Sequence, residues 1–264
     1  MKIGISTASL YPMETEKAFE LLGRNGIPVT EIFFNSPSEL REDFTDKLLK
    51  TKEKYGIEVA SVHPCGSVGE PYFLFSEYLR RYEETRAFYR KYYAAAKKLG
   101  AKTVVLHGDS LVGHISMEEY CKRLCDMNLD AAEYGVSLSH ENVNRYRAAL
   151  PKNVEAIRRL GDDKQSFTFD VKQAVRAGCG VKEMLKAMKG KIVNVHISDN
   201  SSDGDCLLPG RGSFDFKGFF QALSSEGYDG ACLIEVYRYA YDDVGELINS
   251  YRIVNNCHKN IDKL

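Results

Sequence analysis

The chain has 264 residues, of which 44% are hydrophobic and 28% are charged, and its formal net charge at pH 7 is −1. This balance is typical of an ordinary globular protein and gives no general electric field that would attract nucleic acid or a membrane surface. No apolar run approaches the roughly 20 residues of a membrane span. The N-terminal segment MKIGISTASLYPM lacks the long apolar stretch of a signal peptide. We therefore expect a cytoplasmic protein that binds neither nucleic acid nor a membrane.

Seven cysteines are scattered along the chain, and no CxxC motif occurs among them. An odd number without paired spacing favours free thiols in a reducing compartment over a disulfide framework. Cys121 and Cys125 lie four residues apart in a helical stretch, but no second pair accompanies them. We interpret these two side chains as core residues rather than metal ligands.

Short apolar runs with the character of buried strands recur along the whole chain. They cover residues 2–6, 29–34, 58–63, 102–107, 136–141, 166–170, 192–198 and 231–236. Amphipathic segments with helical spacing lie between them, at residues 15–26, 76–101, 116–135, 151–161, 181–190, 216–227 and 242–256. Pro151 suits a first helical position, and glycines such as Gly100 and Gly135 stand where helices should end.

Eight strands that alternate with helical segments in a chain of this length predict an α/β fold, a closed parallel (β/α)₈ barrel or TIM barrel. No linker rich in proline, glycine or serine divides the sequence, so we expect residues 1–264 to form a single domain. The alternative is an open doubly wound sheet. That fold favours a glycine-rich phosphate-binding turn after the first strand, and the segment GISTASLYP contains none.

In a barrel of this kind, functional side chains lie at the C-terminal ends of the strands. Six of the eight predicted strands carry a side chain there that can bind a metal: His63, His107, Glu141, Asp170, His196 and Glu235. Barrel closure would bring three carboxylates together, and they would repel unless one protonates or a cation neutralises them. Imidazoles with carboxylates suit Mn²⁺, Zn²⁺, Fe²⁺ or Co²⁺ rather than Ca²⁺. These residues predict a divalent metal centre, and a purely structural polar cluster is the alternative.

Five segments resemble motifs of the xylose isomerase-like TIM-barrel superfamily: HEN (140–142), FDVKQA (169–174), VHISDN (195–200), LLPGRG (207–212) and LIEVY (233–237). That superfamily includes sugar isomerases and epimerases, inosose-processing enzymes and endonuclease IV, and the resemblance covers essentially the whole chain. It implies one divalent ion, Mn²⁺, Zn²⁺, Co²⁺ or Mg²⁺, with substrate oxygens completing its coordination shell. The implied ligands are Glu141, Asp170, His196 and Glu235.

The resemblance also implies a reaction on a small carbohydrate, which could be a sugar, a sugar phosphate, an inosose or a keto-sugar. The reaction would be an isomerisation or an epimerisation, or that of a related lyase. A bound cation polarises a ketone or aldehyde and stabilises the enediolate that forms when the neighbouring C–H is deprotonated. The resemblance assigns the proton-transfer roles, base and acid in either order, to Glu141 and Glu235. The sequence leaves open which sugar is used and whether it is phosphorylated. It also leaves open whether the chain forms a homo-oligomer.

Other side chains near the predicted site are candidates for contacting the substrate. His63 and His107 are interpreted as ligands of sugar hydroxyls, and the alternative is a second metal shared through Glu141. Lys172 is a candidate electrophile or base, or else a solvated charge. Gln173 can hold a hydroxyl, and Arg211 in the segment PGRG could meet an anionic substrate.

The chain departs from the superfamily's motifs at three positions. Gln173 replaces the histidine of a D-x-x-H motif, and Leu207 replaces a histidine before Pro-Gly, although Asp205 remains. Ser202 replaces an arginine of the ketose epimerases, which argues against standard ketohexose epimerisation.

Two further functions stay open on sequence grounds. An abasic-site nuclease of the endonuclease IV type is compatible with His63 and His107, which match ligands of another zinc in that enzyme. The residues at positions 173 and 207 argue against it, since they remove both histidine ligands of a third zinc. The other alternative is a non-catalytic barrel that binds a metal or a sugar without turnover.

Overall fold

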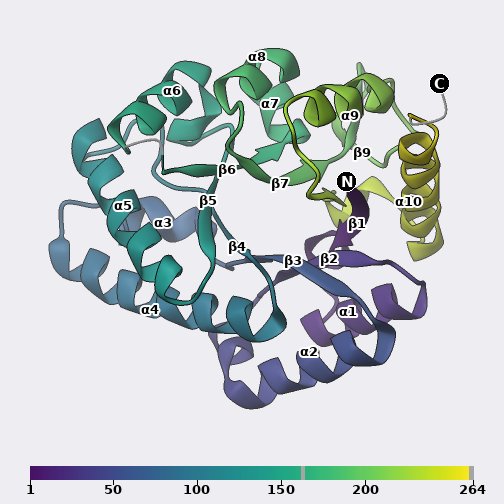
Figure 1. The fold of residues 1–264 in the computed structure, drawn as a ribbon, viewed down its shortest axis with the longest axis horizontal. Helices are drawn as coiled ribbons and strands as arrows, with labels where there is room; N and C mark the ends of the chain where they lie inside the picture. The colour runs from purple at the N-terminus through teal and green to yellow at the C-terminus, as the bar shows by residue number, and fades with distance from the viewer. Residues whose placement is uncertain (162–163, 262–264) are drawn as a thin grey trace.

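The computed structural model describes residues 1–161 and 164–261, and in this part of the chain eight parallel strands form a closed ring surrounded by helices (Figure 1). The strands are β1 (Lys2–Ser6), β2 (Val29–Phe33), β3 (Glu58–His63), β4 (Thr103–Leu106), β5 (Ser137–Glu141), β6 (Ser166–Asp170), β7 (Ile192–Ile197) and β10 (Ala231–Ile234). Each strand pairs with the next in chain order, and the ring closes where β1 pairs with β10. This arrangement confirms the predicted (β/α)₈ barrel.

The helices cover the outside of the ring (Figure 1). They are α1 (Thr15–Arg24), α2 (Glu42–Tyr55), α3 (Glu70–Phe73), α4 (Leu79–Leu99), α5 (Met117–Glu133), α6 (Pro151–Leu160), α7 (Val171–Ala177), α8 (Val181–Ala187), α9 (Phe216–Ser225) and α10 (Val244–Lys259). A small hairpin of β8 (Asp199–Ser201) and β9 (Gly204–Leu207) follows β7. The sequence pattern did not reveal α2, because only Thr45 and Leu48 of its 14 residues are buried.

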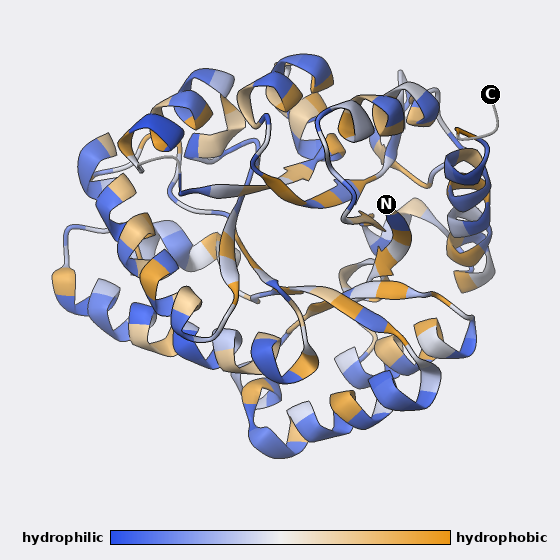
Figure 2. Cartoon of the chain, in the orientation of Figure 1, coloured by the Kyte–Doolittle hydropathy of each residue, from blue (hydrophilic) through white to orange (hydrophobic). Residues whose placement is uncertain are grey.

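Helix α5 illustrates how the sequence forms the outer layer. The Ser116 hydroxyl accepts a hydrogen bond from the Glu119 amide at 3.2 Å, which satisfies one of the unpaired N–H groups at the helix start. Tyr120, Leu124 and Met127 recur every three or four residues, and all three are buried against the barrel. The opposite face is charged, and Figure 2 shows the same alternation of hydrophobic and hydrophilic residues in the other helices.

The apolar core fills the space between the helices and the strands, as well as part of the barrel interior. Gly4 in β1 is needed for this close packing, because a Cβ atom there would lie 1.9 Å from the Val29 carbonyl oxygen. The seven cysteines form no disulfide, as predicted. Among the described helices, none combines the length and the apolarity that a membrane crossing requires.

Candidate metal and substrate site

Four side chains from four strands converge at the C-terminal end of the barrel. Glu141 ends β5, Asp170 ends β6, His196 lies in β7 and Glu235 directly follows β10. One atom of each side chain lies within 4.8 Å of the others, and His196 Nδ1 is 3.5 Å from Glu235 Oε2 and 3.8 Å from Asp170 Oδ2. Strand register explains the convergence, since Asp170 stands directly opposite His196. The structure therefore brings together the four residues predicted to bind a metal.

One atom at the centre of this group has no hydrogen-bond partner. His196 Nδ1 is buried and has none in residues 1–161 or 164–261, and Glu141 turns its Oε1 atom toward it at 3.9 Å. Leaving a buried polar atom unpaired costs about 1–3 kcal/mol. Lone pairs of carboxylate oxygens and an imidazole nitrogen that face one point are the donor set of a borderline divalent cation. The residues therefore fit one divalent ion.

Glu31 in β2 sets the orientation of His196. Its Oε2 atom lies 3.1 Å from His196 Nε2, and both side chains are fully buried. A carboxylate can only accept a hydrogen bond, so Nε2 carries a proton and Nδ1 is the nitrogen that faces the other three residues. Burial works to lower the pKa of His196, but Glu31 and Glu235 hold it well above its ordinary value, and a bound cation would take the place of the Nδ1 proton. The hydroxyls of Ser6 and Ser61, from the strands on either side, donate to Glu31 at 2.9 and 2.7 Å. Sequence analysis missed Glu31, although a carboxylate within the apolar strand VTEIF was an available signal.

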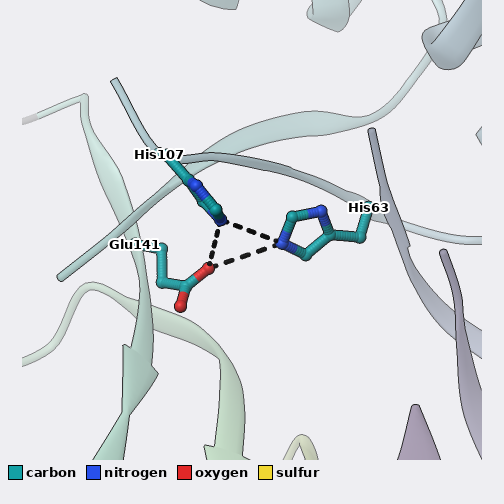
Figure 3. A group of neighbouring side chains, drawn as sticks. All are labelled: His63, His107 and Glu141. Atoms are coloured by element: carbon teal, nitrogen blue, oxygen red, sulfur yellow. Dashed lines mark hydrogen bonds and ion pairs between the residues drawn. The ribbon is translucent and has the colours of Figure 1, made fainter. Parts of the chain in front are cut away.

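A second group of side chains adjoins the first through Glu141 (Figure 3). The Nε2 atoms of His63 and His107 are 3.2 Å apart, and they lie 3.5 and 3.3 Å from Glu141 Oε2. His63 Nδ1 donates to the Pro64 carbonyl at 3.1 Å, so its Nε2 faces the group. Burial opposes a charge on His63, but Glu141 and Glu31 raise its pKa to about 9. The three atoms are close enough to bind either a substrate hydroxyl or a cation.

The loop after β4 places His107 in this group. The Gly108 amide donates to Glu70 Oε2 at 2.6 Å, and the His107 carbonyl lies 3.0 Å from His140 Nε2. Gly108 has a φ of +91°, and a Cβ atom there would lie 2.4 Å from His140 Nε2. Glycine is therefore required directly after His107, because the backbone must be left-handed and must approach His140 closely.

Lys172 reaches into the site from the first turn of α7. Asp170 caps this helix, its Oδ1 accepting from the Gln173 amide at 2.9 Å, so that α7 begins immediately after β6. The Lys172 side chain is 3% exposed, and its Nζ lies 3.0 Å from Asp170 Oδ2 and 2.9 Å from Glu235 Oε2. Burial works to lower the pKa of Lys172, but Asp170 and Glu235 outweigh it and hold that pKa well above its ordinary value. Lys172 is thus a buried ammonium rather than a solvated charge.

A cavity of about 320 Å³ opens above these residues. Its polar lining includes His63, His107, Glu141, Lys172, Gln173 and Glu235, and its aromatic lining includes Tyr11, Phe33 and Tyr237. Small-molecule sites typically measure about 300–1,000 Å³, so this cavity is suited to a small ligand. Aromatic faces combined with several polar groups suit a molecule that has both C–H and hydroxyl surfaces.

The remaining predicted residues are placed differently from one another. Gln173 lines the cavity, and its side-chain oxygen accepts from the Asn144 amide at 3.1 Å. Arg211 is not among the described residues that line the cavity. Its guanidinium lies 2.8 Å from Glu246 in α10 and is 46% exposed.

Residues 18–253 match the family model described as a xylose isomerase-like TIM barrel. The chain belongs to this family. An uncharacterized protein of Mycobacterium tuberculosis is 26% identical to this chain, and the match covers 89% of each chain. An inosose dehydratase of Lacticaseibacillus casei is 24% identical over 61% of this chain and 66% of its own.

Solved structures show the same barrel. A D-tagatose 3-epimerase-like protein superposes with a TM-score of 0.83 at 21% identity, covering 100% of this chain and 99% of its own. The IolI protein, whose crystal structure contains a bound zinc atom, superposes with a TM-score of 0.78 at 20% identity and 99% coverage of both chains. These similarities show that the xylose isomerase-like fold is shared along the whole chain.

Proposed function

We propose that the protein is a divalent-metal-dependent isomerase or epimerase of an uncharged keto sugar or a related inosose, and that it moves a proton on a carbon next to a carbonyl group. One observation carries the proposal. Ligand-type atoms from the ends of β5, β6, β7 and β10 lie within 4.8 Å of one another, and two of the four residues line a cavity of about 320 Å³. The sugar epimerases and the inosose dehydratase among the similar proteins support this assignment.

The metal site would comprise Glu141, Asp170, His196 and Glu235. The unpartnered Nδ1 atom of His196 supports it, as does the zinc atom in the similar IolI protein. A divalent ion bound there supplies a Lewis acid that polarises the substrate carbonyl and stabilises the charge of the enediolate.

Proton transfer is assigned to Glu141 and Glu235 because both line the cavity, whereas Asp170 and His196 lie beneath it. The two glutamates come from β5 and from the end of β10, which are separated in the ring by β6 and β7. They therefore approach the cavity from different positions around the barrel. One carboxylate removes the proton next to the carbonyl and the other returns a proton to the enediolate, as base and acid in either order.

The other cavity residues would position the substrate. His63 and His107 present ring nitrogens at the cavity surface and are suited to bind hydroxyl groups, and Gln173 offers an amide. An uncharged substrate is favoured over a phosphorylated one. Lys172 is the only lysine or arginine among the described residues that line the cavity, so at most one ammonium or guanidinium group faces the substrate. Arg211, the predicted anion ligand, is paired with Glu246 instead.

The proposal is tested by removing the metal with a chelator and restoring Mn²⁺, Co²⁺ or Zn²⁺ in separate samples. Each sample is assayed with free ketoses, ketose phosphates, inososes and 3-keto-glycosides in deuterated solvent, and deuterium incorporation next to the carbonyl is measured. We expect incorporation into an uncharged substrate that disappears with the chelator and returns with metal. Full activity of a folded, metal-free preparation would contradict the proposal. Sugar binding without any exchange would favour the non-catalytic barrel.

A further inference from the structure

Lys172 and the site beneath the cavity use the same oxygen atoms. Its Nζ lies 3.0 Å from Asp170 Oδ2 and 2.9 Å from Glu235 Oε2. Those two oxygens are also the ones that lie 3.8 and 3.5 Å from His196 Nδ1. An ion held by His196 together with these carboxylates would therefore contact the atoms that the ammonium already contacts.

We propose that Lys172 is an internal cation that competes with the divalent ion for Asp170 and Glu235, and that binding of the ion releases its ammonium into the cavity. This inference rests on the metal site of the proposed function. It adds a role for Lys172: metal occupancy decides whether the ammonium is available to a substrate oxygen.

The surroundings of Lys172 allow such a movement. Its backbone is fixed by the cap that Asp170 provides for α7, so only the side chain has to change position. Lys172 already lines the cavity, and its Nζ lies 5.2 Å from the ring centroid of Tyr237, another lining residue. An aromatic face is a favourable neighbour for an ammonium group. The released side chain would thus stay beside the substrate rather than enter bulk water.

Electrostatics gives Lys172 two effects of opposite sign. In the metal-free protein its charge offsets the buried carboxylates of Glu141, Asp170 and Glu235, which would otherwise repel one another. In the presence of a divalent ion, the same charge repels the ion and occupies its ligands. Removing the charge should therefore destabilise the metal-free protein and at the same time strengthen metal binding.

The test compares Lys172→Met with the wild-type protein, using Mn²⁺ or Zn²⁺ alone as the probe. The dissociation constant is measured by competition with a chelator, and the melting temperature is measured with and without the ion. We expect the variant to bind the ion about ten- to a hundredfold more tightly, since a unit charge in direct contact with two ligands is removed. We also expect the metal-free variant to have a lower melting temperature than the metal-free wild type. Its melting temperature should rise more than that of wild type when the ion is added. Lys189→Met, which removes an exposed ammonium paired with Glu226, is the matched control and should change neither quantity.

A second neutral variant, Lys172→Gln, guards against a folding defect specific to methionine. Neutral variants that fold only with the ion present would support the proposal. Unchanged or weaker metal binding by both variants, or failure of both to fold even with saturating ion, would show that Lys172 is purely structural. If the wild-type protein binds no divalent ion, the proposed function itself is refuted. If wild type and variants bind the ion with equal dissociation constants, only the role of Lys172 is refuted.

Discussion

Glu31 Oε2 lies 3.1 Å from His196 Nε2, although the two residues are 165 positions apart in the sequence. The hydrogen bond holds the imidazole with its proton on Nε2, so that Nδ1 faces Glu141, Asp170 and Glu235. Glu31 is thus a positioning residue that acts on the proposed metal through His196.

Replacing Glu31 by glutamine should weaken metal binding. The glutamine amide can still form a hydrogen bond with the imidazole but cannot fix the proton on Nε2. Loss of a carboxylate that orients a metal-binding histidine typically costs about 10- to 100-fold in metal affinity. The measurement is the dissociation constant of Zn²⁺ or Mn²⁺ by chelator competition. Glu58→Gln, at an exposed position in the neighbouring β3, is the matched control and should leave the affinity unchanged. Equal affinities of Glu31→Gln and wild type would show that Glu31 only fills space.

Glu141→Gln and Glu235→Gln should differ from Asp170→Asn in the step that they affect. The two glutamates line the cavity and are assigned proton transfer, whereas Asp170 lies beneath it. Each glutamine variant should reduce solvent deuterium exchange by about 10²- to 10⁴-fold while it keeps part of its bound metal. Asp170→Asn should lose activity in proportion to its loss of metal, and added metal should restore activity in part. Near wild-type exchange by both glutamine variants would refute the assignment.

Asp130 in α5 provides a prediction about stability and pH. It accepts from Arg86 at 2.6 and 2.9 Å and from Arg90 at 2.7 Å. Burial works to raise the pKa of Asp130, but the two guanidinium groups hold it below its ordinary value. Because the folded-state pKa is the lower one, the stabilisation is complete above the ordinary pKa of about 3.9 and is lost as the pH falls through the folded-state value.

Asp130→Asn should therefore lower the free energy of unfolding by about 1–2 kcal/mol at pH 7, as expected for a partly exposed, charge-assisted pair. Urea denaturation at several pH values should show a constant difference down to about pH 5 and a shrinking one below it. Asp126→Asn is the control, since Asp126 is more exposed and lies 3.8 Å from Arg86. A difference that persists undiminished at the acid end would contradict the ion-pair explanation.

The protein should not cleave abasic DNA, even though His63, His107 and Glu141 form a second cation-type group. Clustered metals suit phosphodiester hydrolysis because charge must be neutralised on several oxygens. Gln173 and Leu207 supply no imidazole, and both oxygens of Asp205 are bound by Arg176 at 2.6 and 2.8 Å.

The assay uses an abasic-site duplex at low salt with excess Zn²⁺ or Mn²⁺, conditions that favour weak binding to DNA. We expect no nicking above background. Multiple-turnover nicking that disappears in Glu141→Gln would overturn the sugar-enzyme proposal.

The strands and the residues at their ends were accessible to sequence analysis because both depend on local pattern. Short apolar runs followed by a histidine or a carboxylate, such as VVLH and FTFD, indicate a strand and the candidate site residue at its C-terminal end together. The helix α7 and the β8–β9 hairpin were missed because neither has an apolar pattern: α7 buries the polar side chains of Lys172 and Gln173, and most of the hairpin is only half-buried.

What the sequence could not reveal were the partners of individual charges. Arg211 in the segment PGRG has the composition of an anion ligand, and only the folded chain shows that Glu246 binds it. Lys172 could be a solvated charge or a buried one until α7 was seen to begin at Asp170 and to direct the side chain inward. Glu31 gains its role from a histidine five strands away along the chain, a distance that no local pattern spans.

The closure of the ring between β1 and β10 also bears on how the protein is made. During synthesis Glu31, Glu141, Asp170 and His196 emerge first, and Glu235 emerges only with the last strand. A chain still growing on the ribosome would therefore offer an incomplete set of the proposed ligands, without the β1–β10 pairing that holds their strands in register. Capture of the ion would be among the final events in maturation, and truncation before residue 231 would yield a product that cannot retain it.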